Sequence, residues 1–266
     1  MSNYSYERDS KNNLTKKVVF HKFRMEKNGI DYNFNQPNIT QNTTFPINSR
    51  YEYNIKNFYH DNQTNTYIYQ ISKCSKDREI SVSSSPNPTR NIKNVDEVHY
   101  WISIRKNKLW GTTTINNYPL STKQLSELFE KVFSLKLTFF QLPNFDVLDE
   151  IKKVGIAKFV VRADIPSYQL PNSTFIDKVK KLKDKFFTTI EINNSKNDNI
   201  FSDIDLDEKF VDSINDDNYI VLKGPGRKTI KTNQIKKQKS FYFKEFLTTH
   251  SVDFSSMKEC LLDLWS

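Results

Sequence analysis

The hydrophobic and polar positions alternate most regularly between Glu97 and Pro166, and the rest of the chain is organised around this stretch. Alternation with a period of two predicts strands, and apolar residues that recur every three to four positions predict helices. The stretch is therefore expected to contain, in order, two strands, a helix, a strand, a helix and a strand: His99–Arg105, Leu109–Ile115, Ser121–Phe133, Leu135–Leu142, Asp146–Val154 and Ile156–Ile165.

The first two of these strands carry two tryptophans, whose placement depends on the turn between them. If Lys106-Asn107 forms a two-residue turn, Ser103 pairs with Trp110. One face of the pair then gathers two indoles flanked by cations: Trp101, Arg105, Lys108 and Trp110. Such a face could hold unpaired bases or a phosphate backbone. The alternatives are that a helix covers Trp101, or that a longer loop moves Trp110 to the opposite face.

Both helices of the stretch have well-marked ends. Ser121 and Gln124 form a capping-box pattern ahead of apolar residues with helical spacing, which predicts the start of the first helix. The second helix has Asp146 in its first turn and two lysines in its last, as the helix dipole favours. Gly155 then supplies the stop signal.

Weaker patterns flank the central stretch. Val18–Met25 and Thr66–Ser72 alternate as strands, whereas Asp31–Asn65 shows only short pieces of strand pattern. Ser81–Asn94, with its serines and prolines, predicts a loop that marks a boundary. We expect an α+β protein with mixed, mainly antiparallel sheets and a few packed helices. Its expected regions are a β-rich part (1–95), a central α+β core (96–192) and a C-terminal hairpin-and-helix part (198–266).

The C-terminal part contains a hairpin and a helix. Tyr219–Lys223 and Lys228–Asn233 flank a Gly-Pro-Gly turn, which predicts a β-hairpin. Met257 to Trp265 has helical spacing after a cap at Ser255 or Ser256. The apolar face of this helix is expected to dock on the core or to pair with another subunit.

The net charge of +9 raises the prospect of nucleic acid, a membrane surface or an acidic protein as partner. The strand at Ile156–Ile165 is expected to point Lys158, Val160 and Arg162 outward. A helix over Phe175–Phe186 exposes lysines, although such a face is often simply solvated. The segment from Lys223 to Lys244 has no acidic residue. The candidate phosphate contacts are Arg105, Lys108, Lys158, Arg162, Lys178, Lys181, Lys185, Lys223, Arg227, Lys228, Lys231, Lys236, Lys237 and Lys239.

Composition bounds the remaining possibilities. The two cysteines, Cys74 and Cys260, have no disulfide-framework or zinc spacing, so a reducing cytosol is expected. The first residues lack the apolar core of a signal peptide, and no run reaches the roughly 20 apolar residues of a membrane span. We therefore expect a cytoplasmic protein without membrane insertion.

Patterns for catalysis and metal binding are weak. The four histidines are dispersed, which gives no local support for a metal cluster or a catalytic triad. Asp146 and Glu150 imitate a nuclease motif, but they lie on a predicted helix where the dipole explains them better. The acidic run from Asp203 to Asp207 lacks the glycine and final carboxylate of a calcium loop. No catalytic residue, cofactor or metal is expected.

Three segments of the central stretch resemble the RexA phage-exclusion proteins in element order and spacing: Thr112–Phe129, Leu135–Leu142 and Asp146–Pro166. The most similar piece is Val154–Pro166, a glycine followed by an alternating basic strand that ends in Ile-Pro. The resemblance implies an α+β, dimeric, cytosolic protein of bacterial or prophage origin that binds duplex DNA with little sequence preference. It implies no catalytic residues, and it does not extend to the acidic stretch before Lys223 or to the aromatic C-terminal segment.

The leading hypothesis is a non-enzymatic, phosphate-directed DNA-binding protein of an antiphage defence system. One rival is an abortive-infection nuclease that acts on RNA or DNA. The other rival is an interaction protein that regulates a membrane effector or an acidic partner protein. Convergence of the predicted lysines on one continuous surface would support binding of an anionic partner, whereas scattered lysines would leave the net charge of +9 as a contribution to solubility alone.

Overall fold

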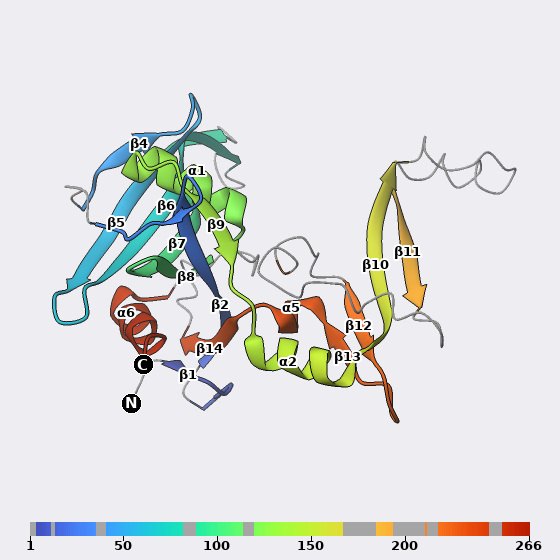
Figure 1. Cartoon of the computed structure of the whole chain (residues 1–266). Coiled ribbons are helices and arrows are strands. Elements are labelled where there is room, and N and C mark those ends of the chain that lie inside the picture. The colour runs from blue at the N-terminus through green and yellow to red at the C-terminus, as the bar shows by residue number, and fades with distance from the viewer. Residues whose placement is uncertain are drawn as a thin grey trace, which may run out of the picture. The chain divides into compact units, whose positions relative to one another are not determined.

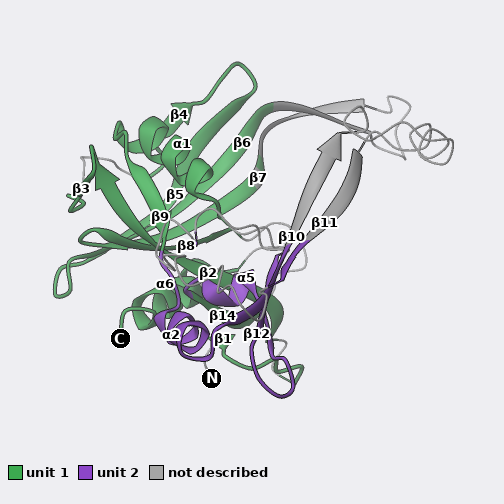
Figure 2. Ribbon diagram, turned by 45° about the vertical axis from the view of Figure 1, so that its right-hand side comes forward, with its two compact units in different colours: residues 1–141, 238–266 green, residues 142–237 purple. Residues whose placement is uncertain are grey.

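The computed structural model of the chain describes residues 4–11, 14–35, 41–81, 89–113, 120–166, 185–193, 211, 218–244 and 252–266. These residues form two compact units, which Figure 2 colours separately. Unit 1 comprises Met1–Gln141 and Gln238–Ser266, and unit 2 is the segment Leu142–Lys237. The predicted α+β class with mainly antiparallel sheets is confirmed.

Unit 1 is built on a ten-stranded sheet (Figure 1). Its main path runs β1-β14-β2-β8-β7-β6-β5-β4, and β3 and β9 pair with β2. The strands are β1 (Tyr4–Ser5), β2 (Leu14–Lys27), β3 (Ile30–Asp31), β4 (Thr44–Pro46), β5 (Tyr51–Asp61), β6 (Thr66–Ser81), β7 (Thr89–Arg105), β8 (Lys108–Thr113), β9 (Thr138–Gln141) and β14 (Gln238–Lys244).

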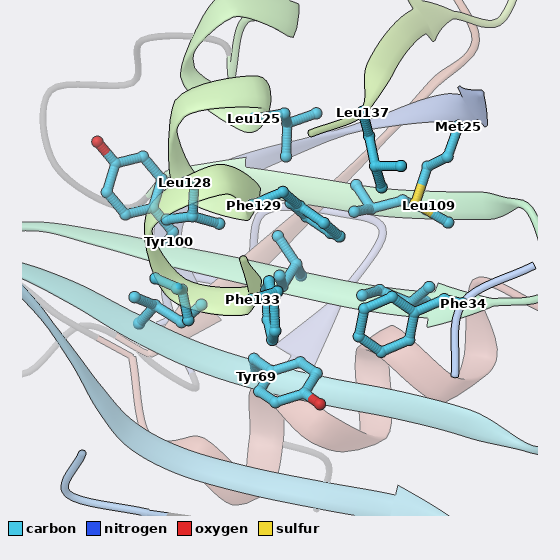
Figure 3. Close-up of a cluster of buried hydrophobic side chains, with 14 of the residues drawn as sticks. Met25, Phe34, Tyr69, Tyr100, Leu109, Leu125, Leu128, Phe129, Phe133 and Leu137 are labelled. Carbon is cyan, nitrogen blue, oxygen red and sulfur yellow. The ribbon is translucent and has the colours of Figure 1, made fainter. Parts of the chain in front are cut away.

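One face of this sheet packs against α1 (Thr122–Phe133) to form the larger core. The predicted capping box is confirmed, because the backbone N–H of Gln124 donates to the Ser121 hydroxyl at 3.2 Å and the Gln124 side chain accepts from Ser121 N–H at 2.9 Å. The helix presents a buried apolar stripe to the strands. Figure 3 shows the ring of Phe133, the last residue of α1, above the ring of Tyr69 in β6. The two ring centroids are 5.1 Å apart.

The opposite face of the sheet is covered by α6 (Phe254–Asp263). This helix is capped by Asp253, whose carboxylate accepts a hydrogen bond from Ser256 N–H at 2.9 Å, so the predicted serine cap is corrected. Successive residues of β7 alternate between the two cores, as a strand requires. Tyr100 and Ile102 face α1, and Trp101 faces α6.

Unit 2 contains a four-stranded antiparallel sheet in the order β11-β10-β12-β13. Its elements are α2 (Phe145–Val154), β10 (Ile156–Pro166), β11 (Lys185–Asn193), β12 (Tyr219–Leu222), β13 (Thr229–Lys231) and α5 (Thr232–Ile235). The predicted inward and outward faces of β10 are corrected at Val160, which is only 2% exposed. A β-bulge between Ile156 and Lys158 precedes this residue and brings Ile156 into the same core as Phe159, although the two are an odd number of residues apart.

The predicted loop over Ser81–Asn94 is also corrected at Ser81 and at 89–94, which lie in strands, while 82–88 lie outside the described residues. Strand β7 begins at Thr89 and pairs with β6 from Thr66 opposite Arg105 to Ser81 opposite Thr89. Hydrogen bonding across the pair extends both strands into a segment whose composition is typical of a loop. Position 95 therefore lies within a strand of unit 1, and the two compact units differ from the three predicted regions.

Candidate nucleic-acid interface

A tight turn with three cations joins β12 to β13 in unit 2. Ile220 and Ile230 pair across this hairpin, and both are buried in the core of the unit. Leu222 N–H donates to the carbonyl oxygen of Lys228 at 2.9 Å, which closes the base of the turn. The turn itself is exposed, and its cations are Lys223, Arg227 and Lys228.

Arg227 has a φ of 39°, in the left-handed region that residues with a side chain rarely adopt. Such a backbone costs a non-glycine residue on the order of 1 kcal/mol. A glycine at this position would therefore suit the turn better than the arginine. Because the exposed arginine does not improve the turn, its side chain is a candidate for a role outside folding.

The C-terminal end of α2 lies against the same turn. Lys223 N–H donates to the carbonyl oxygen of Gly155 at 2.9 Å. A Cβ atom at Gly155 would lie 3.3 Å from Cδ of Lys223, so the glycine lets the lysine chain lie across the helix end. The ammonium of Lys228 forms an ion pair with the carboxylate of Glu150 in α2. These contacts tie the turn to the helix.

The last turn of α2 adds two exposed lysines, Lys152 and Lys153. They also suit the partial negative charge of a helix C-terminus. We define the hairpin cluster as Lys152, Lys153, Lys223, Arg227 and Lys228. Among the residues that the structure describes, Lys228 alone of these five has an ion-pair partner. The cluster thus presents several cations that are available to an anionic ligand.

Two predicted contact residues are engaged in contacts within their own unit. Lys158 Nζ lies 2.8 Å from Glu191 Oε2, across the pair of β10 and β11. Arg105 donates from Nε to Thr66 Oγ1 at 2.8 Å, and its guanidinium lies 5.0 Å from the ring centroid of Trp265. Both side chains therefore form contacts within their own unit of the fold.

The other predicted cations are dispersed over the two units or lie outside the residues that the structure describes. Lys231 is exposed in β13, and Lys236 and Lys237 are half-buried after α5. Lys108 is exposed and Lys239 half-buried in unit 1. The structure gives only the backbone of Arg162 and Lys185, and Lys178 and Lys181 lie outside the described residues. The hairpin cluster thus unites Lys223, Arg227 and Lys228 with two lysines that the sequence assigned to helix capping.

The predicted exposed stacking surface is corrected. The two-residue turn at Lys106-Asn107 is confirmed, and Ser103 pairs with Trp110 as expected. Trp101 and Trp110 do share a face, but they are 0% and 1% exposed. Helix α6 covers that face, so the alternative in which a helix lies over Trp101 holds and neither indole can reach a base.

The cations around these indoles hold the C-terminal segment in place. The indole N–H of Trp265 donates to the Ser103 hydroxyl at 2.8 Å. Lys22 Nζ lies 5.1 Å from the ring centroid of Trp110 and 5.2 Å from that of Trp265. The combination of indole and cation that predicted a ligand surface therefore serves packing within unit 1.

The excess positive charge is distributed unevenly between the units. Unit 1 contains 23 Lys and Arg against 16 Asp and Glu, and unit 2 contains 17 against 15, which gives +7 and +2. The hairpin cluster nevertheless lies in unit 2, the unit with the smaller net charge. The net charge of a unit is thus a poor guide to where its exposed cations gather.

A second polar cluster, which the sequence did not reveal, joins β5, β6 and β7. Cys74 Sγ donates to Asp96 Oδ1 at 3.0 Å, and Lys56 Nζ lies 3.1 Å from the same oxygen. His99 Nε2 lies 3.6 Å from the other oxygen of Asp96. Gln70 Nε2 donates to His99 Nδ1 at 3.1 Å. The pairing of β6 with β7 brings these residues together. The cluster could therefore be predicted only from the correct ends and register of these two strands.

The cluster is unsuited to thiol chemistry. Burial, together with the hydrogen bond to Asp96, raises the pKa of the Cys74 thiol to about 11. Burial lowers the pKa of His99 and outweighs the opposing effect of Asp96. Because an amide N–H occupies Nδ1 and the carboxylate faces Nε2, neither ring nitrogen of His99 points at the thiol. Asp96, rather than the histidine, is the partner of Cys74.

Comparisons with family models, with curated proteins and with solved structures found no match to this chain. Within the described residues, no three His, Cys, Asp or Glu side chains are grouped so that they could hold a metal ion. The described helices are too short or too polar for any of them to cross a membrane.

Proposed function

We propose that the protein binds DNA through its backbone phosphates, with little dependence on sequence, and that the hairpin cluster is the principal contact. The observation that carries this proposal is the convergence of five cations from two elements on one exposed turn and helix end. Lysine and arginine side chains that neutralise phosphates supply most of the affinity in sequence-independent binding. Arg227 supports the proposal further, because it occupies a backbone position that favours glycine.

The biological setting follows from the resemblance to the RexA proteins. It is phage exclusion in a bacterial or prophage context, in the cytosol, with duplex DNA as the ligand. A second copy of the chain and an effector protein are the further partners that this setting suggests.

The first test is the dependence of affinity on salt. Each neutralised phosphate contributes about −0.9 to the slope of log affinity against log salt, so five contacts predict a roughly 500-fold loss between about 50 and 200 mM. Fluorescence anisotropy with duplexes of several unrelated sequences measures this slope. Absence of binding at both salt concentrations would overturn the proposal. Cleavage of the DNA on addition of a divalent metal ion would indicate the rival nuclease instead.

The second test separates binding from folding at a single residue. Arg227→Gly removes a cation from the hairpin cluster and relieves the left-handed backbone, so the variant should be at least as stable as the wild type. Its affinity for DNA should fall, and its salt slope should become less steep by roughly one. Lys108→Gln in unit 1 is the matched control. Equal affinity of the Arg227→Gly variant and the wild type would contradict the assignment.

A further inference from the structure

Helix α2 carries an exposed aromatic ring that the fold does not use. Phe145, its first residue, keeps 61% of its surface exposed. Among the unit 2 side chains that the structure describes, no other aromatic ring is exposed to this degree. Leu148 and Ile151 supply the buried stripe of the same helix. The ring therefore lies outside the core that the helix helps to form.

The ring is on the same helix as two members of the hairpin cluster. Residues seven apart lie on the same side of an α-helix, which places Phe145 in line with Lys152. With a rise of 1.5 Å per residue, the two positions are separated by on the order of 10 Å along the axis. A short length of nucleic-acid strand can span that distance.

The chemistry of this end of α2 favours a base rather than a phosphate. Asp146 and Asp149 are exposed beside Phe145, and their carboxylates would repel a phosphate group. A phenyl ring, in contrast, offers a face on which any base can stack, since every base has a π-face. In a duplex these faces are occupied by neighbouring bases, so the ring can be used only by an unpaired base.

We infer that Phe145 stacks on an unpaired base of a strand whose phosphates contact the hairpin cluster. The inference rests on the proposed function and specifies its ligand, since it predicts that DNA with unpaired bases binds more tightly than fully paired DNA. The sequence assigned stacking to Trp101 and Trp110, which the fold buries. Phe145 takes that role from a different element of the chain.

The experiment uses the full chain and three variants at one position. A 20-nucleotide oligo(dT) and a 20-base-pair duplex are titrated by fluorescence anisotropy at about 50 mM salt, where phosphate contacts are strong. Phe145→Ala should weaken binding of the single strand by roughly 5- to 150-fold and leave duplex binding unchanged. Phe145→Leu should behave like alanine, because it keeps an apolar side chain but has no ring face. Phe145→Trp should restore the affinity.

The outcomes separate this inference from the proposed function. If Arg227→Gly weakens both ligands while Phe145→Ala changes neither, the phosphate-binding function stands and the stacking role is wrong. If Phe145→Ala weakens single strand and duplex equally, or if leucine rescues as well as tryptophan, stacking on an unpaired base is likewise excluded. If the wild type binds neither ligand, both proposals fail together.

Discussion

The indole face of unit 1 and the hairpin cluster of unit 2 contain similar chemistry in opposite environments. Around Trp101 and Trp110, cations and aromatic rings are enclosed beneath α6, where Lys22 lies between two indoles. In the hairpin cluster the cations are exposed, and an aromatic ring on the same helix is exposed as well. A combination of cations and aromatic rings in the sequence therefore does not by itself indicate a binding surface. It must also be known whether another helix or strand covers those residues.

The energetic difference between the two regions follows from burial. Each apolar side chain that α6 buries against the sheet contributes about 1.5–3 kcal/mol, so uncovering the indoles would cost a large part of the stability of a typical domain. The hairpin cluster needs no rearrangement to meet a ligand. We therefore expect substitutions in the first region to change stability and substitutions in the second to change binding.

The largest expected effect is on the stability of unit 1. Trp101→Ala removes a fully buried ring from the α6 core and should lower the free energy of unfolding by roughly 3–5 kcal/mol. Urea denaturation followed by circular dichroism measures the loss. Phe145→Ala, an exposed ring in unit 2, is the control and should change stability by less than about 0.5 kcal/mol. A small loss of stability combined with a loss of DNA binding would mean that Trp101 contacts the ligand.

The next effect should appear in binding alone. Replacing Lys152 and Lys153 together by glutamine should make the salt slope less steep by roughly two and weaken all DNA sequences alike. Lys108→Gln serves again as the control, because it removes an exposed cation from unit 1. If the double variant retained the wild-type slope while the control lost affinity, the phosphate contact would belong to unit 1.

A smaller effect is expected at Arg105, which the sequence placed among the phosphate contacts. Its hydrogen bond to Thr66 and its position over Trp265 predict that Arg105→Ala lowers stability by about 1 kcal/mol. The salt slope of DNA binding should stay unchanged. If the Arg105→Ala variant had wild-type stability but a less steep salt slope of DNA binding, Arg105 would be a phosphate contact after all.

The smallest effect concerns pH and the polar cluster on the indole side of β7. Burial lowers the pKa of His99, so the folded state favours the neutral ring more than the unfolded chain does. The unfolded chain then binds more protons below its own pKa of about 6.5, and stability should decrease as the pH falls through that range. The charged side chains that act on this ring are Asp96, Lys56 and Lys16.

Chemical denaturation at pH 7.5 and at pH 5.0 tests this expectation. His99→Gln should reduce the difference in stability between the two conditions, and His60→Gln, at a half-buried histidine stacked on Tyr67, is the control variant. An unaltered pH dependence in the His99 variant would show that other groups control it.

Local signals in the sequence predicted several elements correctly. The capping box at Ser121, the stop at Gly155 and the two-residue turn at Lys106-Asn107 each depend on residues that are close in the chain. The same holds for the hairpin of β12 and β13. Features set by neighbouring residues could therefore be read before the fold was known.

Features that depend on distant residues could not be predicted in this way. The burial of Trp110 is decided by α6, which lies far along the chain, and the cluster around Asp96 requires the pairing of β6 with β7. The hairpin cluster was predicted in part, because the turn is cationic in sequence. Lys152 and Lys153 were missed as members, since the helix dipole explained them locally.

The pairing of β14 with β2 determines when unit 1 can be completed during synthesis. Residues Leu14–His21 of β2 hydrogen-bond to Gln238–Lys244 of β14, and all of unit 2 lies between these segments in the chain. Until β14 leaves the ribosome, this edge of β2 lacks the strand that pairs with it. The apolar face of the sheet that α6 covers in the finished fold is also still without that helix. Such an unpaired edge is a template for aggregation, and contacts so distant in sequence form slowly. Unit 1 can therefore close only after the whole of unit 2 has been made.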